Sequence, residues 1–306
     1  MVSDEPLPHV RPLYSYKTIL QFKQDLEFFL KHFSPVHPED LLKYLREGTS
    51  LPRAGFLLSF DDGFREVADI VAPILKAKGV SAMIFVNSAF VDNRELCFLQ
   101  KIALLVEQLT AKSSAALKGR LEQLFREKGI PADTLVLMLK SVRYANRAVL
   151  DEAAALCNME FDSFLKHQKP YLTSPQIRGL LGDGFTIGGH SVDHPFYGDL
   201  TLEEQLSQTR QSMKFLQDEF ALKQRAFAFP HSDTGVSRAF FERSYGGGTL
   251  EISFGTGGLL RDSWPGHFQR FSMEKTTLPP ATTVARQYAR RLFRRVAGGE
   301  VMVRPA

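Results

Sequence analysis

The 306-residue chain lacks the features of small disulfide-stabilised or membrane-spanning proteins. It has two cysteines, Cys97 and Cys157, which are too few for a disulfide framework, so we expect two reduced thiols. No run reaches the roughly 18 apolar residues that a membrane-spanning helix needs. The polar, acidic start at residues 1–6 has no apolar segment typical of a signal peptide, which favours a cytoplasmic protein.

The chain also lacks a large excess of either positive or negative charge, because its formal net charge is only +4. The basic excess is concentrated near the C-terminus, so we expect no nucleic-acid partner. The composition is 44% hydrophobic and 24% charged, as in ordinary globular proteins, and the length suits one large barrel-like domain or two smaller ones. The oligomeric state stays open.

An apolar run at residues 55–60 ends in a pair of carboxylates, Asp61 and Asp62. A run that is apolar on both faces suits a buried parallel strand. The carboxyl ends of such strands are where α/β folds place their chemistry. Because adjacent carboxylates repel, two at one strand end favour a shared cation or two different roles.

A second predicted strand, residues 185–188, is followed by His190 and His194. A helical turn would bring these two imidazoles to one face, because they are four residues apart. Two histidines and one carboxylate leave open positions on a divalent metal, which is typical of a catalytic site. Alone, either pair is more often a cap or a surface feature, but both follow predicted strands, which favours a site.

These residues resemble two motifs of the polysaccharide deacetylases, the NodB-homology group of carbohydrate esterase family four. Ser59-Phe60-Asp61-Asp62-Gly63 resembles the T/S-F-D-D-G motif, and His190-Ser191-x-x-His194-Pro195 resembles the H-S/T-x-x-H-P motif. The resemblance implies an α/β fold with a distorted (β/α)7-type barrel, in one domain over residues 1–306.

The resemblance also implies the roles of the site residues. Asp62, His190 and His194 would hold one divalent metal ion, Zn²⁺ first, with Ni²⁺, Co²⁺ or Mn²⁺ as alternatives. Asp61 would act as general base. The expected function is metal-dependent hydrolysis of N-acetyl or O-acetyl groups on a carbohydrate substrate, a cell-surface or lipid-linked polysaccharide or amino sugar.

The region around Pro230 resembles the third family motif. There, the backbone N–H after the proline helps to hold the oxyanion, which here would be the N–H of His231. The arginine that many members place two residues before the proline is Ala228 in this chain. Arg270 and Arg225 are both candidates to orient the general base instead.

The last family motif, which carries a general-acid histidine, has no clean match. His267 is the nearest candidate, although an ordinary loop histidine is the alternative interpretation. The absent arginine and the unclear acid leave open a sugar-binding relative without activity. A metal-dependent amidase acting on a non-carbohydrate acyl amide is a further alternative.

Two helical regions lie outside these motifs. Residues 95–170 are predicted to form an inserted helical subdomain that covers the site, binds a partner or packs on the barrel, with helices at 96–110, 113–128, 132–141 and 146–168. Residues 281–306 are predicted to form a basic helix and tail. That helix is either a solvated face or a peripheral contact with an anionic membrane surface. Its arginines are Arg286, Arg290, Arg291, Arg294 and Arg295.

Overall fold

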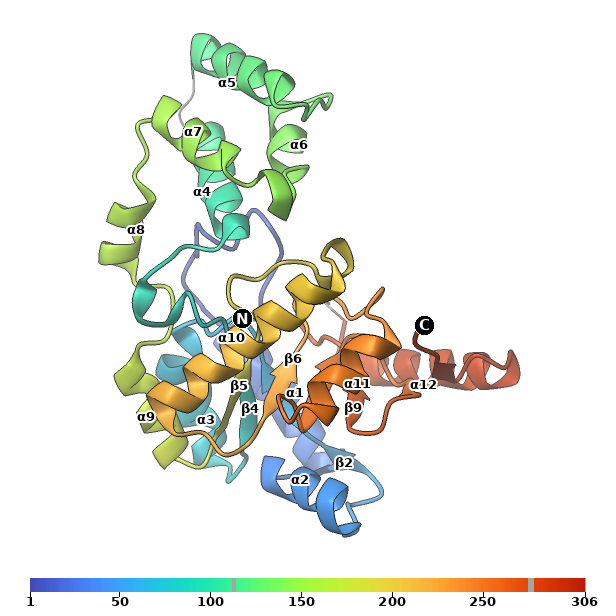
Figure 1. Cartoon of the computed structure of the whole chain (residues 1–306). Coiled ribbons are helices and arrows are strands. Elements are labelled where there is room, and N and C mark those ends of the chain that lie inside the picture. Colours follow the sequence, from blue (N-terminus) through green and yellow to red (C-terminus); the bar gives the residue numbers. More distant parts are fainter. Residues whose placement is uncertain (112–113, 275–277, 306) are drawn as a thin grey trace.

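The computed structural model describes residues 1–111, 114–274 and 278–305, with a six-stranded sheet at its centre (Figure 1). Two predicted boundaries, at residues 113 and 306, fall outside these ranges. The strand order is β3-β4-β5-β6-β7-β9, and every neighbouring pair is parallel. The strands are β3 Leu58–Phe60, β4 Ala82–Val86, β5 Thr186–Gly189, β6 Ala226–Ala228, β7 Ile252–Gly255 and β9 His267–Gln269.

The centre of this sheet is covered on both faces. All five residues of β4 are buried, as expected for an apolar run in a parallel sheet between helices. The next strand, β5, packs so closely that glycine is needed at Gly188. A Cβ there would lie 2.6 Å from the Phe85 ring and 2.8 Å from the carbonyl oxygen of Ala226.

The sheet curves into a half-barrel, which confirms the predicted (β/α) barrel-type fold. Within the described residues, the edge strands β3 and β9 do not pair with each other. A short strand β1 (Ser34–Pro35) pairs with β2 (Gly55–Phe56), and only Leu57 separates β2 from β3. The main sheet therefore has six strands, and β1 and β2 form a separate two-stranded parallel sheet in the segment that leads into β3.

Helices surround the sheet, with α10 crossing in front of it in Figure 1. The N-terminus of α10 has the capping box that its sequence predicts, with Thr201 and Glu204 each bonded to the other's backbone. The helices packed around the sheet are α1 Ile19–His32, α2 Pro38–Glu47, α3 Ala72–Ala77, α9 Ser174–Gly182, α10 Leu202–Phe220 and α11 Arg238–Gly246.

Five helices between β4 and β5 form the region predicted as an insertion. They share a hydrophobic core with each other and with the N-terminal residues Leu7 and Val10. Figure 1 shows α4 to α7 extending away from the sheet. The predicted helix at 146–168 is in fact two helices. That the region is a separate subdomain stays a prediction. The five are α4 Phe98–Ala111, α5 Ala115–Glu127, α6 Leu135–Lys140, α7 Val149–Leu156 and α8 Phe161–Gln168.

The C-terminal part comprises α12 (Pro280–Val296) and a short pair of parallel strands, β8 (Arg261–Asp262) and β10 (Val301–Met302). Cys97 and Cys157 are both free and buried. Across the described ranges, none of the helices combines the length and apolar character that crossing a bilayer requires.

Candidate metal centre and active site

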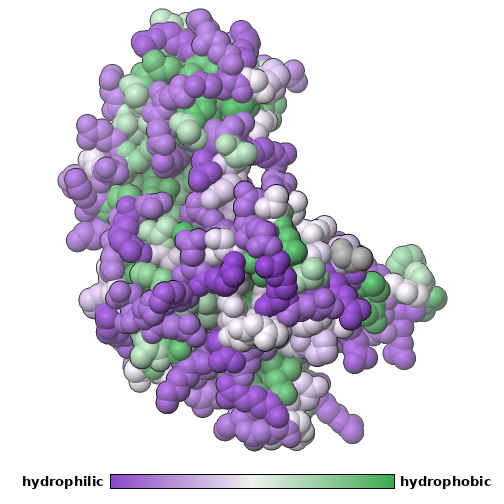
Figure 2. Space-filling model, in the orientation of Figure 1, coloured by the Kyte–Doolittle hydropathy of each residue, from purple (hydrophilic) through white to green (hydrophobic). Residues whose placement is uncertain are grey.

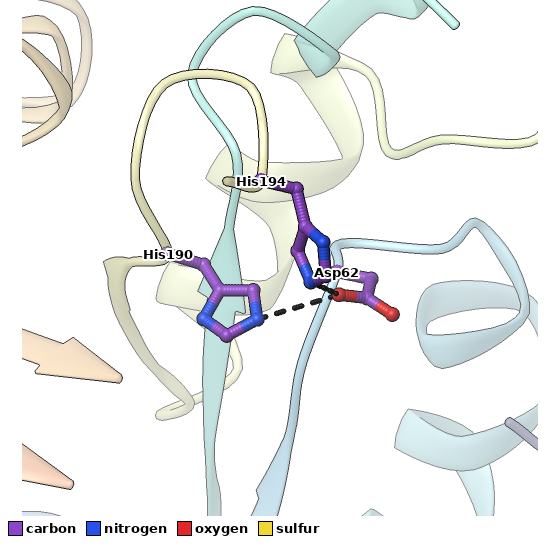
Figure 3. Close-up of side chains that lie close together, drawn as sticks. All are labelled: Asp62, His190 and His194. Atoms are coloured by element: carbon purple, nitrogen blue, oxygen red, sulfur yellow. Dashed lines mark ion pairs between the residues drawn. The ribbon is translucent and has the colours of Figure 1, made fainter. Parts of the chain in front are cut away.

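Three predicted metal ligands converge at the carboxyl ends of two strands (Figure 3). Asp62 follows β3, and His190 follows β5, while β4 lies between those strands. His194 comes from the same loop as His190. The helical turn expected to align the two histidines does not form. Instead, Ser191 and His194 adopt left-handed backbone angles, φ 72° and 66°, and the loop turns back over the strand end.

The ligand atoms of this group, here called the Asp62 cluster (Asp62, His190 and His194), lie within 4.8 Å of one another. The Oδ1 atom of Asp62 is 3.3 Å from Nε2 of His190 and 3.0 Å from Nε2 of His194. Both histidine side chains are nearly buried, whereas the Asp62 side chain is 26% exposed. The two histidines are therefore packed inside the protein, and the cluster is open to solvent on the side of the Asp62 carboxylate.

A hydrogen bond on the far side of the His190 ring fixes the tautomer of this histidine. It therefore decides whether the nitrogen that faces Asp62 carries a hydrogen or a lone pair. Its Nδ1 lies 2.7 Å from the carbonyl oxygen of Ala228, which can only accept, so Nδ1 carries the hydrogen. Neutral His190 then presents a lone pair on Nε2 to a carboxylate oxygen. Two acceptors that face each other need a cation or an added proton between them. A metal ion would supply that charge, and the hydrogen bond from Nδ1 would orient the His190 ring toward it.

The charges within the Asp62 cluster favour the ionised form of its carboxylate and the protonated form of His190. Burial alone would raise the pKa of Asp62, but His194 and His190 outweigh it and hold that pKa well below its usual value. Burial would lower the pKa of His190, but the carboxylates of Asp61 and Asp62 raise it above the ordinary value. The site thus favours an ionised carboxylate and positive charge beside it.

Asp61 is held by an arginine that sequence reasoning left unassigned. Arg270 follows β9 and donates to both carboxylate oxygens of Asp61, at 2.8 and 2.9 Å, and to the hydroxyl of Ser59 at 2.7 Å. Arg270 rather than Arg225 therefore replaces the arginine missing at position 228. Although burial raises the pKa of Asp61, Arg270 and His190 outweigh burial and lower it. The ion pair between Arg270 and Asp61 also joins the two edge strands of the half-barrel, because Arg270 follows β9 and Asp61 follows β3.

The loop after β6 brings His231 beside the cluster. Its ring centroid is 4.5 Å from that of His194, and its side chain is exposed. Partial desolvation of the ring by the surrounding protein, followed by the nearby His194, lowers the pKa of His231 to about 3, so the ring is neutral near pH 7. Within the described residues, the backbone N–H of His231 donates to no protein group.

His267, the predicted general acid, is packed in a network outside the Asp62 cluster, and its role stays a prediction. Its side chain is buried, and its ring nitrogens lie 2.6 Å from the Ser253 hydroxyl and 3.1 Å from an Asp233 carboxylate oxygen. It is also the first residue of β9, whereas Arg270 follows the last. At about 3.3 Å per residue, His267 lies about 10 Å before the strand end where Asp61 is held.

This second group, here called the Asp233 cluster (Asp233, Asp262 and His267), also has ligand-like spacing. Its positive charge comes from Arg304, which pairs with both carboxylates and donates to the backbone oxygen of Asp233 at 2.9 Å. Gly255 makes room for this network, because a Cβ there would meet the Asp233 carboxylate at 2.4 Å. Of this cluster, sequence reasoning singled out His267 alone, because the three members share no local motif.

The inserted region contacts the loop between His190 and His194 through Tyr144. Its hydroxyl donates to an Asp193 carboxylate oxygen at 2.6 Å, and Arg147 lies 3.5 Å from the same oxygen. Gln208 of α10 donates to the other Asp193 oxygen at 2.8 Å. Asp193 precedes His194, so the insertion and α10 together hold the loop that carries both histidines.

Comparison with known proteins identifies the family of the chain. A family model described as polysaccharide deacetylase matches residues 50–244, which is more than half of the chain. The chain belongs to the polysaccharide deacetylase family. No curated protein matches the sequence.

Solved structures share the fold of the chain at low identity. The Streptococcus pyogenes deacetylase PplD in complex with acetate is 12% identical, covers 93% of each chain and has a TM-score of 0.57. IcaB from Ammonifex degensii is 15% identical over 89% of each chain, with a TM-score of 0.55. A de-N-acetylase from Aggregatibacter actinomycetemcomitans is 12% identical over 94% of this chain and 96% of that chain, with a TM-score of 0.54.

Proposed function

We propose that the protein is a metal-dependent hydrolase that removes N-acetyl groups from an amino sugar in a polysaccharide or a lipid-linked glycan. The observation that carries this proposal is the lone pair of His190 Nε2 facing the Asp62 carboxylate, since a bound cation would bridge these two acceptors. An ionised carboxylate, Asp61, stands next to that position. A cation site with an adjacent base is the minimal apparatus for hydrolysis of an acyl group.

Asp62, His190 and His194 would hold the metal. Two histidines and one carboxylate match the donor set of catalytic zinc sites, which favours Zn²⁺ over Ni²⁺, Co²⁺ or Mn²⁺. When bound, such an ion supplies Lewis acidity toward the acyl carbonyl and toward water. The hydrogen bond from His190 Nδ1 to the Ala228 carbonyl fixes the tautomer that binding requires.

Asp61 would act as the general base. Arg270 occupies both of its oxygens, keeps it ionised and fixes its orientation. In this proposal Asp61 accepts a proton from the attacking water and then passes it to the leaving nitrogen. The second step needs no acid from the buried His267.

The backbone N–H of His231 would stabilise the oxyanion that forms on the acyl oxygen. Pro230 precedes it and fixes the direction of the chain at the end of the β6 segment. A backbone donor in a fixed turn needs no reorganisation as charge develops, which is how oxyanion sites lower a barrier. The His231 side chain is neutral near pH 7, so its ring adds no competing positive charge.

The family supports a carbohydrate substrate, and one of the similar structures is described as a de-N-acetylase. An amine is a poorer leaving group than an alkoxide and needs a proton, which Asp61 can return. We therefore favour N-acetyl over O-acetyl groups.

The test combines metal content with acetate release for the wild-type protein and for Asp61→Asn. Both should bind about one metal ion per chain, but Asp61→Asn should hydrolyse an N-acetylglucosamine oligomer about 10²–10⁴-fold more slowly. Asp218→Asn is the matched control, because Asp218 is an exposed carboxylate on α10 that pairs with Lys214, and its rate should equal that of wild type.

The substrate panel separates the remaining alternatives. An O-acetylated sugar and a non-carbohydrate acyl amide are assayed beside the oligomer. Faster turnover of the acyl amide would show an amidase of a different substrate class. A wild-type protein that binds no metal even after zinc is added would refute the hydrolase and leave a sugar-binding relative as the better interpretation.

A further inference from the structure

The exposed part of α12 carries an unusual apolar face. Leu292 is 63% exposed, Phe293 74% and Val296 83%, and Tyr288 lies one turn before Leu292. Spacing of four places Tyr288, Leu292 and Val296 in one row along the helix, with Phe293 beside them. Single exposed apolar residues are common, but a contiguous row on one helix is typical of an interaction surface.

A basic stripe runs along the edge of this apolar face. Arg286, Arg290 and Arg294 are also four residues apart and exposed. The helix contains five arginines and no acidic residue. Arg291 and Arg295 on the other flank pair with Glu300, so the basic stripe is the part whose charge is not met by a carboxylate in the described ranges.

The start of α12 is anchored to the body, and the rest projects from it. Thr283 and Val284 are buried, and the helix packs against α1 near its beginning. Figure 1 shows the remaining turns leaving the body, and Figure 2 shows apolar and hydrophilic side chains next to each other on that projection. The apolar face thus lies on a helix that projects from the body and is anchored at its start.

We propose that α12 docks the protein on a lipid bilayer that contains anionic headgroups. The apolar face would enter the boundary between headgroups and acyl chains, and the basic stripe would contact the anionic headgroups beside it. A second copy of the chain fits this surface less well, because a twofold interface would bring two basic stripes together. The inference does not depend on the proposed hydrolysis.

Vesicle flotation tests the proposal with the full-length protein. The protein should float with vesicles of phosphatidylcholine mixed with phosphatidylserine and remain unbound with phosphatidylcholine alone. Arg290→Gln with Arg294→Gln should bind roughly 30-fold more weakly, since each arginine contributes about a factor of five near an anionic surface. Leu292→Ala with Phe293→Ala should bind at least about tenfold more weakly, because less apolar area is buried.

The matched control is Arg120→Gln with Arg126→Gln, which removes the same charge from exposed positions on α5 and should leave binding unchanged. Every variant should melt at the wild-type temperature, because all the changed side chains are exposed. Absence of binding to either vesicle, or equal binding to both, would overturn the proposal. So would a wild-type dimer in solution that Leu292→Ala with Phe293→Ala converts to monomer.

Discussion

The Asp62 cluster and the Asp233 cluster have similar ligand atoms and spacing, but different surroundings. In the Asp62 cluster the carboxylate side chain is 26% exposed, and its neighbours are two histidines. In the Asp233 cluster all three side chains are at most 1% exposed, and Arg304 supplies the positive charge. One cluster is open and calls for a cation, whereas the other is closed and already has one.

This difference shows that ligand spacing alone does not identify a metal site. Removing carboxylates from water is costly unless a counter-charge is present, and a fixed guanidinium meets that requirement as well as an ion does. What distinguishes a catalytic site is a counter-charge that the protein itself does not provide. By this criterion we propose the Asp62 cluster as the metal centre and assign the Asp233 cluster a structural role.

The largest effect should come from removing a ligand of the Asp62 cluster. His194→Ala should lose the bound metal and reduce acetate release to background, because one of three protein ligands is gone. Elemental analysis and the acetate assay on the same samples measure both quantities. His167→Ala, at an exposed position of α8, is the matched control and should keep both. Full metal content in His194→Ala would contradict the assignment.

The second effect is on stability rather than on metal content. Arg304→Met leaves two buried carboxylates without their counter-charge, and should lower the free energy of unfolding by about 3–5 kcal/mol at pH 7. Urea unfolding measures the change. Arg126→Met, which breaks an exposed pair with Glu122, should cost at most about 1 kcal/mol. Loss of metal in folded Arg304→Met would show that the two clusters are not independent.

The difference in stability between wild type and Arg304→Met should depend on pH. Burial would raise the pKa of Asp233, but bonds from His267, Arg304 and Gln269 hold it far below its usual value. A depressed folded pKa gives stability above the unfolded value of about 3.9 and loses it as pH falls further. The advantage of wild type over Arg304→Met should therefore shrink below about pH 4. An advantage that stays constant between pH 7 and pH 3 would contradict the charge explanation.

The sequence was sufficient for features that depend on neighbouring residues. Asp61 and Asp62 directly follow a predicted strand, and His190 follows another, so parallel strand ends bring them together. The backbone between His190 and His194 was predicted wrongly as a helical turn, because packing against the strand end overrides the local preference.

Features that depend on distant pairings could not be predicted. Two arginines were candidates to orient Asp61, and only the position of β9 opposite β3 across the barrel opening selects Arg270. His267 was nominated from its place in the sequence, but its place within β9 puts it in the core. Arg304 lies 71 residues from Asp233, so no local pattern joins them.

The smallest effect we predict concerns the link between the insertion and the metal loop. Tyr144→Phe removes the hydroxyl that donates to Asp193, while Gln208 still holds the other carboxylate oxygen. Loss of such an outer contact should weaken zinc binding by about tenfold and leave the free energy of unfolding within about 1.5 kcal/mol of wild type. Competition with a chelator measures the affinity, and Tyr44→Phe, at an exposed tyrosine of α2, is the control. Unchanged affinity in Tyr144→Phe would mean that Gln208 alone orders the loop and that the insertion only packs beside it.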